Sequence, residues 1–202
     1  MIIVDPGRGN LRSVQKALQT VGVQAVVTAD PDVVRKADRV VLPGVGAFGD
    51  CMDTLRSTGL AEAVTEVVDQ GRPYLGICLG MHVLFEGSEE FGRHAGMGWL
   101  PGSVQRLTAG PGVKVPHMGW NRVTRPKSHW VLGPEGPGEH YYFVHSFHAV
   151  PAPEAVGAWC DHGGAFAAAV VAGENVVAVQ FHPEKSQADG LALLDRFARW
   201  SP

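Results

Sequence analysis

Residues 72–86 read RPYLGICLGMHVLFE and place one cysteine, Cys78, between glycines at positions 76 and 80. The apolar run over 72–77 predicts a buried strand, and the residues over 79–86 predict a helix. A strand that passes directly into a helix needs a sharp turn. Such a turn exposes the side chain of the residue at its apex at the carboxyl edge of a parallel sheet. The stretch therefore predicts an α/β fold with Cys78 at that edge.

The surroundings of Cys78 suit a nucleophilic thiol. Glycines on both sides let the backbone turn and leave room for a substrate carbonyl. A helix N-terminus favours the thiolate and supplies backbone N–H groups for an oxyanion. Cysteine is also among the most buried residue types, so an inert core thiol is the alternative interpretation of this position.

Strands and helices alternate on the N-terminal side of this turn. The expected elements are strands over 2–4, 23–27 and 39–44 and helices over 10–22 and 51–71. Asn10 is a suitable N-cap and Gly22 a suitable stop for the first helix, and Gly59 is expected to interrupt or bend the second. The alternation predicts right-handed crossovers and a three-layer α/β fold, with helices on both faces of a largely parallel central sheet.

The second half of the chain has a different sequence pattern, which indicates strands and hairpins rather than crossover helices. Prolines and glycines punctuate residues 100–150, and loops are expected at 108–112 and 133–139. The expected elements are strands over 140–150, 164–171 and 175–181 and a closing helix over 187–200. At 202 residues, the whole chain, 1–202, is expected to form a single domain.

Composition and charge exclude several classes of function. A net charge of -3 provides no basic stripe for nucleic acid, and no apolar run reaches the length of a membrane helix. The three cysteines are an odd number without C-x-x-C spacing, which disfavours disulfides and zinc. We therefore expect a cytoplasmic protein that binds neither nucleic acid nor a membrane.

Two further patterns are too weak to predict a cofactor or a metal. The GRGNLR segment after the first strand resembles the start of a dinucleotide fingerprint, but Arg12 stands where the third glycine belongs. His145 and His148 are three apart on an expected strand, so their side chains face opposite sides. No HExxH pattern is present. We expect no cofactor and no metal.

The segment VQFHPEKS, residues 179–186, supplies a base and an orienting carboxylate for Cys78. In an extended chain, residues two apart point to the same face, so His182 and Glu184 are expected side by side. Pro183 biases His182 away from a helical conformation. Strands ending near 77 and 181 would bring Cys78 and this pair to one sheet edge. The alternative interpretation is that His182 is an ordinary surface histidine at a strand end and that Glu184 is a solvated carboxylate.

Seven segments together carry a family resemblance: GNLRSV, LPGVGAFGD, GICLGM, LFEGSEE, VPHMGWN, YYFVHSFH and VQFHPEKS, which span residues 9–186. G-x-C-x-G with H-P-E resembles the class I (triad) glutamine amidotransferases. PGVGAFGD, PHMGWN and HPEKS are more specific and resemble the glutaminase subunits of imidazole glycerol phosphate synthase, an enzyme of histidine biosynthesis.

The resemblance implies that L-glutamine is hydrolysed through a γ-glutamyl thioester on Cys78, with His182 as general base and Glu184 orienting it. It also implies an oxyanion hole and a substrate pocket. The oxyanion hole would use backbone N–H groups of Leu79 and of Val45 or Gly46. The substrate would be held by Glu90, which receives its ammonium group, by backbone groups of Ser146 and Phe147, and by Gly44.

Ammonia would then pass to a cyclase subunit, forming a heterodimer. The resemblance places Asn10, Trp120, Tyr142 and Lys185 on the cyclase-facing surface. Three readings stay open: this subunit, another cysteine hydrolase on the same scaffold, such as a glutaminase for a different acceptor or a γ-glutamyl hydrolase, and a catalytically silent binding subunit.

The chain departs from the family pattern at His82, where a substrate-contacting glutamine is usual. Histidine also forms hydrogen bonds, but it is shorter in reach and titrates near neutral pH. We therefore expect His82 to contact the substrate and to introduce a pH dependence between about pH 6 and 7.5.

Overall fold

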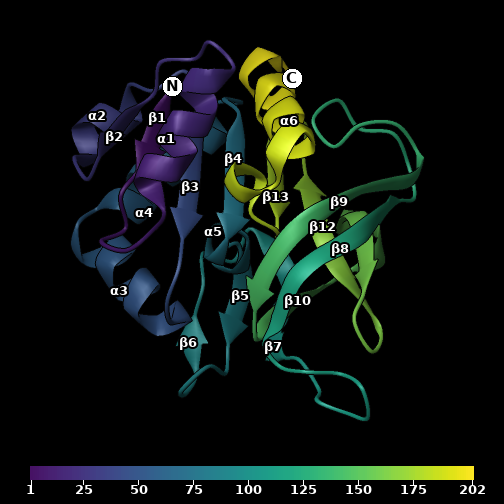
Figure 1. The fold of residues 1–202 in the computed structure, drawn as a ribbon. Coiled ribbons are helices and arrows are strands. Elements are labelled where there is room, and N and C mark those ends of the chain that lie inside the picture. Colours follow the sequence, from purple (N-terminus) through teal and green to yellow (C-terminus); the bar gives the residue numbers. More distant parts are fainter.

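A nine-stranded sheet runs through the centre of the computed structural model, which describes residues 1–202 (Figure 1). The strand order is β2-β1-β3-β4-β13-β12-β11-β8-β9. Five neighbouring strands are parallel: β2 (Val26–Thr28), β1 (Ile2–Val4), β3 (Val40–Gly44), β4 (Tyr74–Cys78) and β13 (Val176–Val179). The rest are antiparallel: β12 (Ala165–Ala172), β11 (Val156–Asp161), β8 (His117–Arg125) and β9 (Gly136–His145). This confirms the expected change from crossovers to hairpins.

A second sheet of four strands lies below the carboxyl end of β4 in Figure 1. Its order is β10-β7-β5-β6, with bounds β10 (Phe147–Pro151), β7 (Leu100–Arg106), β5 (Phe85–Ser88) and β6 (His94–Ala95). The strands β5 and β7 are parallel, and the other pairs are antiparallel. The β5–β6 hairpin was not predicted from the sequence, because both strands are short and lack a clear alternation of apolar and polar residues.

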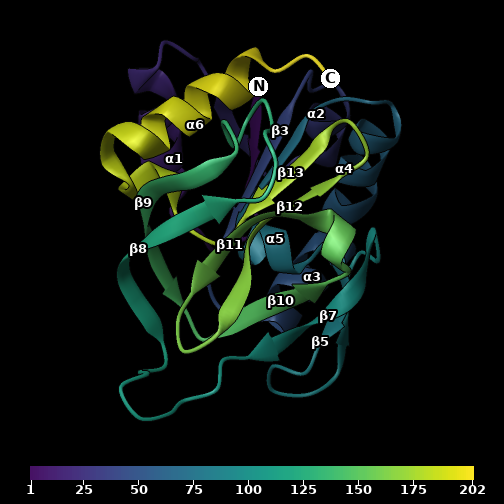
Figure 2. The ribbon, with the colours of Figure 1, turned by 90° about the vertical axis from the view of Figure 1, so that its right-hand side faces the viewer.

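Helices cover both faces of the central sheet (Figure 2). One face carries α1 (Leu11–Thr20) and α6 (Gln187–Arg199), and the other carries α2 (Pro31–Arg35), α3 (Phe48–Ser57), α4 (Leu60–Asp69) and α5 (Leu79–His82). Two single-turn 3₁₀ helices, η1 (Pro153–Ala155) and η2 (Pro183–Lys185), complete the elements. None of the helices is both long and apolar enough to cross a membrane.

Alternation along the parallel strands divides the core into two clusters. Ile3 and Val41 face α1 and α6, whereas Val4 and Leu42 face α3 and α4. All four are at most 1% exposed. Burying each such aliphatic side chain contributes about 1.5–3 kcal/mol, so both faces of the sheet stabilise the layered arrangement.

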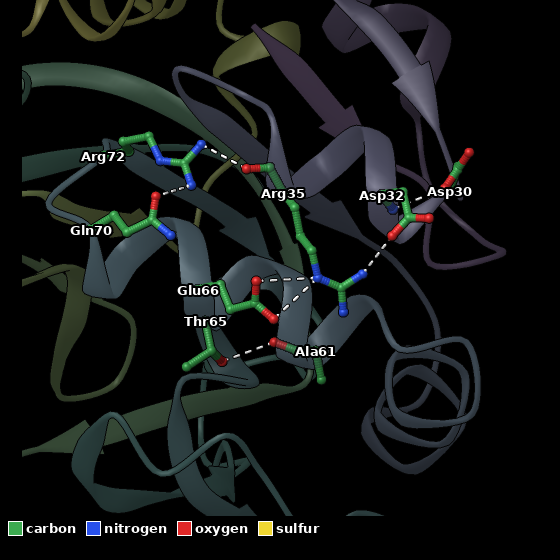
Figure 3. Close-up of polar contacts among 8 residues, drawn as sticks. All are labelled: Asp30, Asp32, Arg35, Ala61, Thr65, Glu66, Gln70 and Arg72. Carbon is green, nitrogen blue, oxygen red and sulfur yellow. Dashed lines mark hydrogen bonds and ion pairs between the residues drawn. The ribbon is translucent and has the colours of Figure 1, made fainter.

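The helices α2 and α4 are also joined by polar contacts (Figure 3). The Arg35 guanidinium donates from Nε to Glu66 Oε1 at 3.1 Å and from Nη1 to Asp32 Oδ1 at 2.9 Å. Arg72 Nη1 donates to the Arg35 carbonyl oxygen at 2.8 Å. The helix α2 was not predicted from the sequence because its five residues are too few to show a helical period.

The expected helix over 51–71 is two helices, α3 and α4, separated at Gly59. Gly59 has a φ of 73°, a left-handed conformation that glycine adopts without steric cost. Gly22, which follows α1, also has a positive φ, of 80°. These two glycines therefore end helices as their positions predicted.

Two further predicted elements differ from the structure. The helix expected over 79–86 ends at His82, because the chain enters β5 at Phe85 and pairs with β7. The single strand expected over 140–150 is broken at Ser146 into β9 and β10, which belong to different sheets. Since β9 pairs with β8 and β10 pairs with β7, the break turns residues 145–147 toward the carboxyl end of β4.

The turn between β4 and α5 is strained and tightly packed. Cys78 has a φ of 55° and a ψ of -106°, an unusual conformation for a residue with a side chain. A Cβ on Gly76 would overlap the backbone of Gly80, and a Cβ on Gly80 would overlap the Leu42 carbonyl group of β3. Both flanking glycines are therefore required for α5 to lie against the sheet.

We expect Gly80→Ala to lower the free energy of unfolding by at least about 2 kcal/mol, because backbone atoms of β3 must move to admit the methyl group. Urea unfolding followed by circular dichroism measures this. Gly110→Ala is the matched control: a Cβ there meets no atom within 4 Å. Its effect is expected to stay within about 0.5 kcal/mol. Equal stability of the two variants would contradict the packing described for the turn.

Candidate active site

A cavity of about 390 Å³ opens at the carboxyl ends of β4 and β13. Most of the residues singled out from the sequence line it: Val45, Gly46, Cys78, Leu79, His82, Glu90, Ser146, Phe147, His182 and Lys185. They come from five separate segments: the end of β4 with α5, and the residues that follow β3, β5, β9 and β13. Gly44 does not line the cavity; it pairs with Cys78 in the sheet and packs against Leu79.

His182 and Glu184 lie side by side, as expected, but the backbone that joins them is not extended. His182 Nδ1 lies 2.9 Å from Glu184 Oε1, and the two side chains are only 2% and 1% exposed. Residues 183–185 form the 3₁₀ turn η2 rather than an extended segment. The turn brings the carboxylate back to the imidazole and leaves the buried Nε2 atom without a hydrogen-bond partner.

Charge interactions favour the protonated form of His182. Burial lowers the pKa of this imidazole, but the hydrogen bond to Glu184 and the charge interactions with Cys78 and Glu184 outweigh burial and raise it to about 10. Because Glu184 occupies Nδ1, Nε2 is the nitrogen that remains to exchange a proton with Cys78. The arrangement suits a thiolate–imidazolium pair.

Hydrogen bonds hold η2 to β9. The His182 N–H donates to the Tyr142 carbonyl at 2.9 Å, and the Tyr142 N–H donates to Ser186 Oγ at 3.0 Å. Ser186 Oγ in turn donates to the His182 carbonyl at 2.6 Å. The backbone of His182 is therefore fixed by a strand that belongs to the antiparallel half of the sheet.

Asn10 lies at the N-cap position of α1, but its side chain makes no capping hydrogen bond. Instead, Asn10 Nδ2 donates to Glu184 Oε1 at 3.4 Å. The N-cap position expected from the sequence is therefore confirmed, but the side chain does not cap the helix, because its amide is engaged by the buried carboxylate. Asn10 thereby contacts the same oxygen that orients His182.

Glu90 is half-buried and faces the cavity. Its Oε2 atom accepts a hydrogen bond from the Phe48 N–H at the start of α3, at 2.8 Å. Ser146 and Phe147 also line the cavity, at the break between β9 and β10. Glu90 is thus a fixed acidic group inside the cavity rather than a solvated member of the acidic run.

His82 lines the cavity but is only 4% exposed. Its Nε2 atom lies 2.7 Å from Gln180 Oε1. Burial, with a smaller contribution from His148, lowers the pKa of His82 to about 4, despite the opposing effect of the hydrogen bond to Gln180. The imidazole is therefore neutral between pH 6 and 7.5, and the pH dependence expected from its titration is wrong.

Two groups beside the cavity were not predicted from the sequence. Gln180 is fully buried, and its amide lies between His82 and Cys78. His145 lines the cavity, with Nδ1 2.9 Å from the Phe147 carbonyl and Nε2 2.9 Å from His117 Nδ1. A polar residue ending the apolar run VVAV was the available signal for Gln180. His145 and His148 lie on different strands, and no cluster of three or more His, Cys, Asp or Glu side chains is arranged to hold a metal ion.

The four residues expected at a partner surface are neighbours in pairs. Trp120 is 47% exposed, and its ring lies 6.2 Å from that of Tyr142 in an edge-to-face arrangement. The Lys185 ammonium lies 5.7 Å from the centre of the Tyr142 ring. Asn10 and Lys185 are joined through Glu184, which bonds the first and precedes the second in the chain.

Comparisons with known proteins agree with this fold. A family model described as glutamine amidotransferase class-I matches residues 2–199. A relative from Syntrophotalea carbinolica, described as imidazole glycerol phosphate synthase subunit HisH, is 50% identical over 98% of both chains. The Aquifex aeolicus protein of the same description is 46% identical over 98% of this chain and 95% of its own.

Solved structures of lower identity share the fold. A crystal structure described as glutamine amidotransferase has a TM-score of 0.74 at 21% identity, covering 98% of both chains. PurLQS from Thermotoga maritima has a TM-score of 0.77 at 19% identity, covering 98% of this chain and 96% of that one. With the family model spanning nearly all residues, this chain belongs to the class-I glutamine amidotransferase family.

Proposed function

We propose that this chain is the glutaminase subunit of an imidazole glycerol phosphate synthase, and that it hydrolyses L-glutamine to glutamate and ammonia. The observation that carries the proposal is the buried pair of His182 and Glu184, whose imidazole and the Cys78 side chain line one cavity large enough for a small substrate. The HisH descriptions of relatives about 50% identical support the assignment to histidine biosynthesis. The whole chain, 1–202, acts as one domain in this proposal.

The first half of the reaction forms a thioester. The Cys78 thiolate attacks the carboxamide carbon of glutamine, and the carbonyl oxygen becomes an oxyanion that accepts from the N–H groups of Leu79 and of Val45 or Gly46. The His182 imidazolium then donates its Nε2 proton to the nitrogen that leaves as ammonia. Removing one oxyanion donor typically costs about 10²-fold or more in rate, so these backbone groups supply several kcal/mol.

The second half releases glutamate. Neutral His182 takes a proton from water, and the resulting hydroxide adds to the thioester carbonyl. Collapse of this adduct breaks the carbon–sulfur bond and returns the Cys78 thiolate. Glu184 keeps Nε2 aimed at the reacting atoms in both halves, because its hydrogen bond fixes the imidazole through Nδ1.

The rest of the cavity accounts for recognition of glutamine. The half-buried carboxylate of Glu90 binds the substrate ammonium group, and backbone groups of Ser146 and Phe147 bind its carboxylate. His82 lines the wall next to the side chain of the substrate. Gly44 acts indirectly, because its lack of a side chain lets Leu79 lie against β3.

The partner is a cyclase subunit that receives ammonia, in a heterodimer. The exposed residues Trp120 and Lys185, with Tyr142 and Asn10, form the contact surface in this proposal. Trp120 is too exposed to be a core residue, and large aromatic rings are common at interface hot spots. Lys185 and Tyr142 also adjoin the backbone of the Glu184–His182 pair, so a partner that contacts them acts on the base.

We expect Cys78→Ala to abolish glutamine-dependent synthesis by the complex while ammonia-dependent cyclisation by the partner continues, because only the nucleophile is removed. Glutamate release and cyclised product are measured with glutamine or ammonium as nitrogen source. Cys160→Ala, at a buried cysteine on β11, serves as the control and should keep both activities. Glutamine hydrolysis by folded Cys78→Ala would eliminate the thioester mechanism.

For His82, we expect His82→Gln to leave unchanged the pH profile of the Michaelis constant for glutamine between about pH 6 and 8. The His82 pKa of about 4 keeps the wild-type imidazole neutral throughout this range, so replacing it removes no titration. Steady-state glutaminase rates of both proteins, with liganded cyclase, give the comparison. A wild-type inflection near pH 6.5 that disappears in the variant would show that His82 titrates as an exposed histidine.

For the partner surface, we expect cyclase carrying its nucleotide ligand to raise the glutaminase rate by about a hundredfold or more, and Lys185→Ala to reduce that activation by about tenfold. The basal rate should change less. Lys127→Ala removes an exposed lysine elsewhere on the molecule and should be activated like wild type. Equal activation of Lys185→Ala and wild type would exclude this lysine from the coupling.

A further inference from the structure

We propose that Gln180 is a catalytic residue whose carboxamide stabilises the Cys78 thiolate, and that His82 is the positioning residue that sets the orientation of this carboxamide. The inference rests on the proposed function, since it assigns a role in forming the same nucleophile. It concerns two side chains that the mechanism above leaves without a chemical task.

Sheet register places Gln180 opposite the nucleophile. Val179 of β13 pairs with Ile77 of the parallel strand β4, so the next residues along, Gln180 and Cys78, lie at the same edge of the sheet. Gln180 follows Ala178 on the sheet face covered by α5, because strand side chains alternate. The same face carries His82, at the last turn of α5.

The carboxamide of Gln180 bridges the other two side chains. Gln180 Oε1 lies 2.7 Å from His82 Nε2, and Gln180 Nε2 donates to Cys78 Sγ at 3.8 Å. Gln180 is 0% exposed, so water does not compete for either contact. Gln180 directly follows the apolar run VVAV of β13. Burying an amide costs folding free energy unless both its N–H and its C=O groups form hydrogen bonds.

His82 determines which end of the amide faces the sulfur. A carboxamide oxygen only accepts hydrogen bonds, so the contact with Oε1 requires a hydrogen on His82 Nε2. With Oε1 held there, the NH₂ group points to Cys78 Sγ. The reversed amide would direct its carbonyl oxygen at the sulfur and would repel a thiolate.

The charge state of His82 makes this orientation independent of pH in the working range. The titratable groups around the amide are Cys78 and His182 at one end and His82, with His145 and His148 near it, at the other. Burial lowers the pKa of all three of these latter histidines, to about 4 for His82 and about 3 for His145. They therefore add no cation that would stabilise the thiolate directly, which leaves His182 and the Gln180 N–H as its side-chain partners.

The test measures the fraction of Cys78 present as thiolate. The rate of alkylation by iodoacetamide is followed against pH in the isolated chain, with peptide mapping to assign the modified cysteine. Burial raises the pKa of Cys51 and Cys160 to about 12, so these thiols stay unreactive over the measured range. We expect Gln180→Met, similar in length but without a donor, to move the midpoint of the Cys78 profile upward by about one pH unit. Its kcat for glutamine should fall at least tenfold with liganded cyclase, with a smaller change in KM.

Gln180→Glu provides a second variant that retains an acceptor for His82. It replaces the donor with a carboxylate against the sulfur, so the midpoint should rise at least as far as in Gln180→Met. Gln19→Glu makes the same chemical change on the exposed side of α1 and should leave the profile unchanged. Circular dichroism establishes that each variant is folded.

The role of His82 is tested by two substitutions that leave Gln180 in place. His82→Leu removes the donor that holds Oε1, so the midpoint should rise by a smaller amount than in Gln180→Met. His82→Gln restores a side-chain N–H donor and should return the midpoint toward wild type. A merely structural role for His82 would not produce this rescue in the alkylation profile.

A wild-type alkylation profile in whichever Gln180 variant is folded would overturn the proposal. Equal profiles for His82→Leu and His82→Gln would overturn the positioning role. These outcomes are separate from failure of the proposed function, which would appear as glutamine hydrolysis by Cys78→Ala. Alkylation reports the thiolate whether or not the chain turns over glutamine.

Discussion

The strained turn at Cys78 is the constraint on which the site depends. A residue with a side chain holds a φ of 55° there, a conformation that costs about 1–3 kcal/mol and persists only when its surroundings enforce it. Close packing on both sides holds this conformation. The absence of a side chain at Gly80 lets α5 contact the Leu42 backbone of β3, and its absence at Gly76 lets the backbone of α5 approach β4. Relaxing the turn would move the sulfur away from both β13 and η2.

Burial and pairing then determine the charges around this turn. Glu184 and His182 are almost inaccessible to water, so neither is stable as an isolated ion, but together with Cys78 they favour an imidazolium. The pKa values of the neighbouring histidines shift in the opposite direction, downward. With no carboxylate beside them, burial lowers the pKa of His82, His117 and His145, and all three remain neutral. The site therefore holds one imidazolium, His182, among neutral histidines.

The sequence predicted the elements that have a clear period or a steric signature. The strand before Cys78, the helix stops at Gly22 and Gly59 and the proximity of His182 to Glu184 were all visible, because local spacing decides them. The short helix α2, the β5–β6 hairpin and the break at Ser146 were not, because pairing with distant strands decides them. Asn10 shows the same limit: its side chain suits a helix cap, but Glu184 reaches it from 174 residues away in the chain. The neutral state of His82 also depends on burial that spacing does not reveal.

The central claim is that Cys78 becomes covalently attached to the γ-glutamyl group during turnover. The direct measurement mixes the complex containing liganded cyclase with isotopically labelled glutamine, quenches it with acid over the course of a single turnover, and maps the label by peptide mass spectrometry. The account predicts a transient label on the peptide that contains Cys78 and none on the peptides with Cys51 or Cys160. Complete conversion of glutamine to glutamate with no label on Cys78 at any time would contradict it.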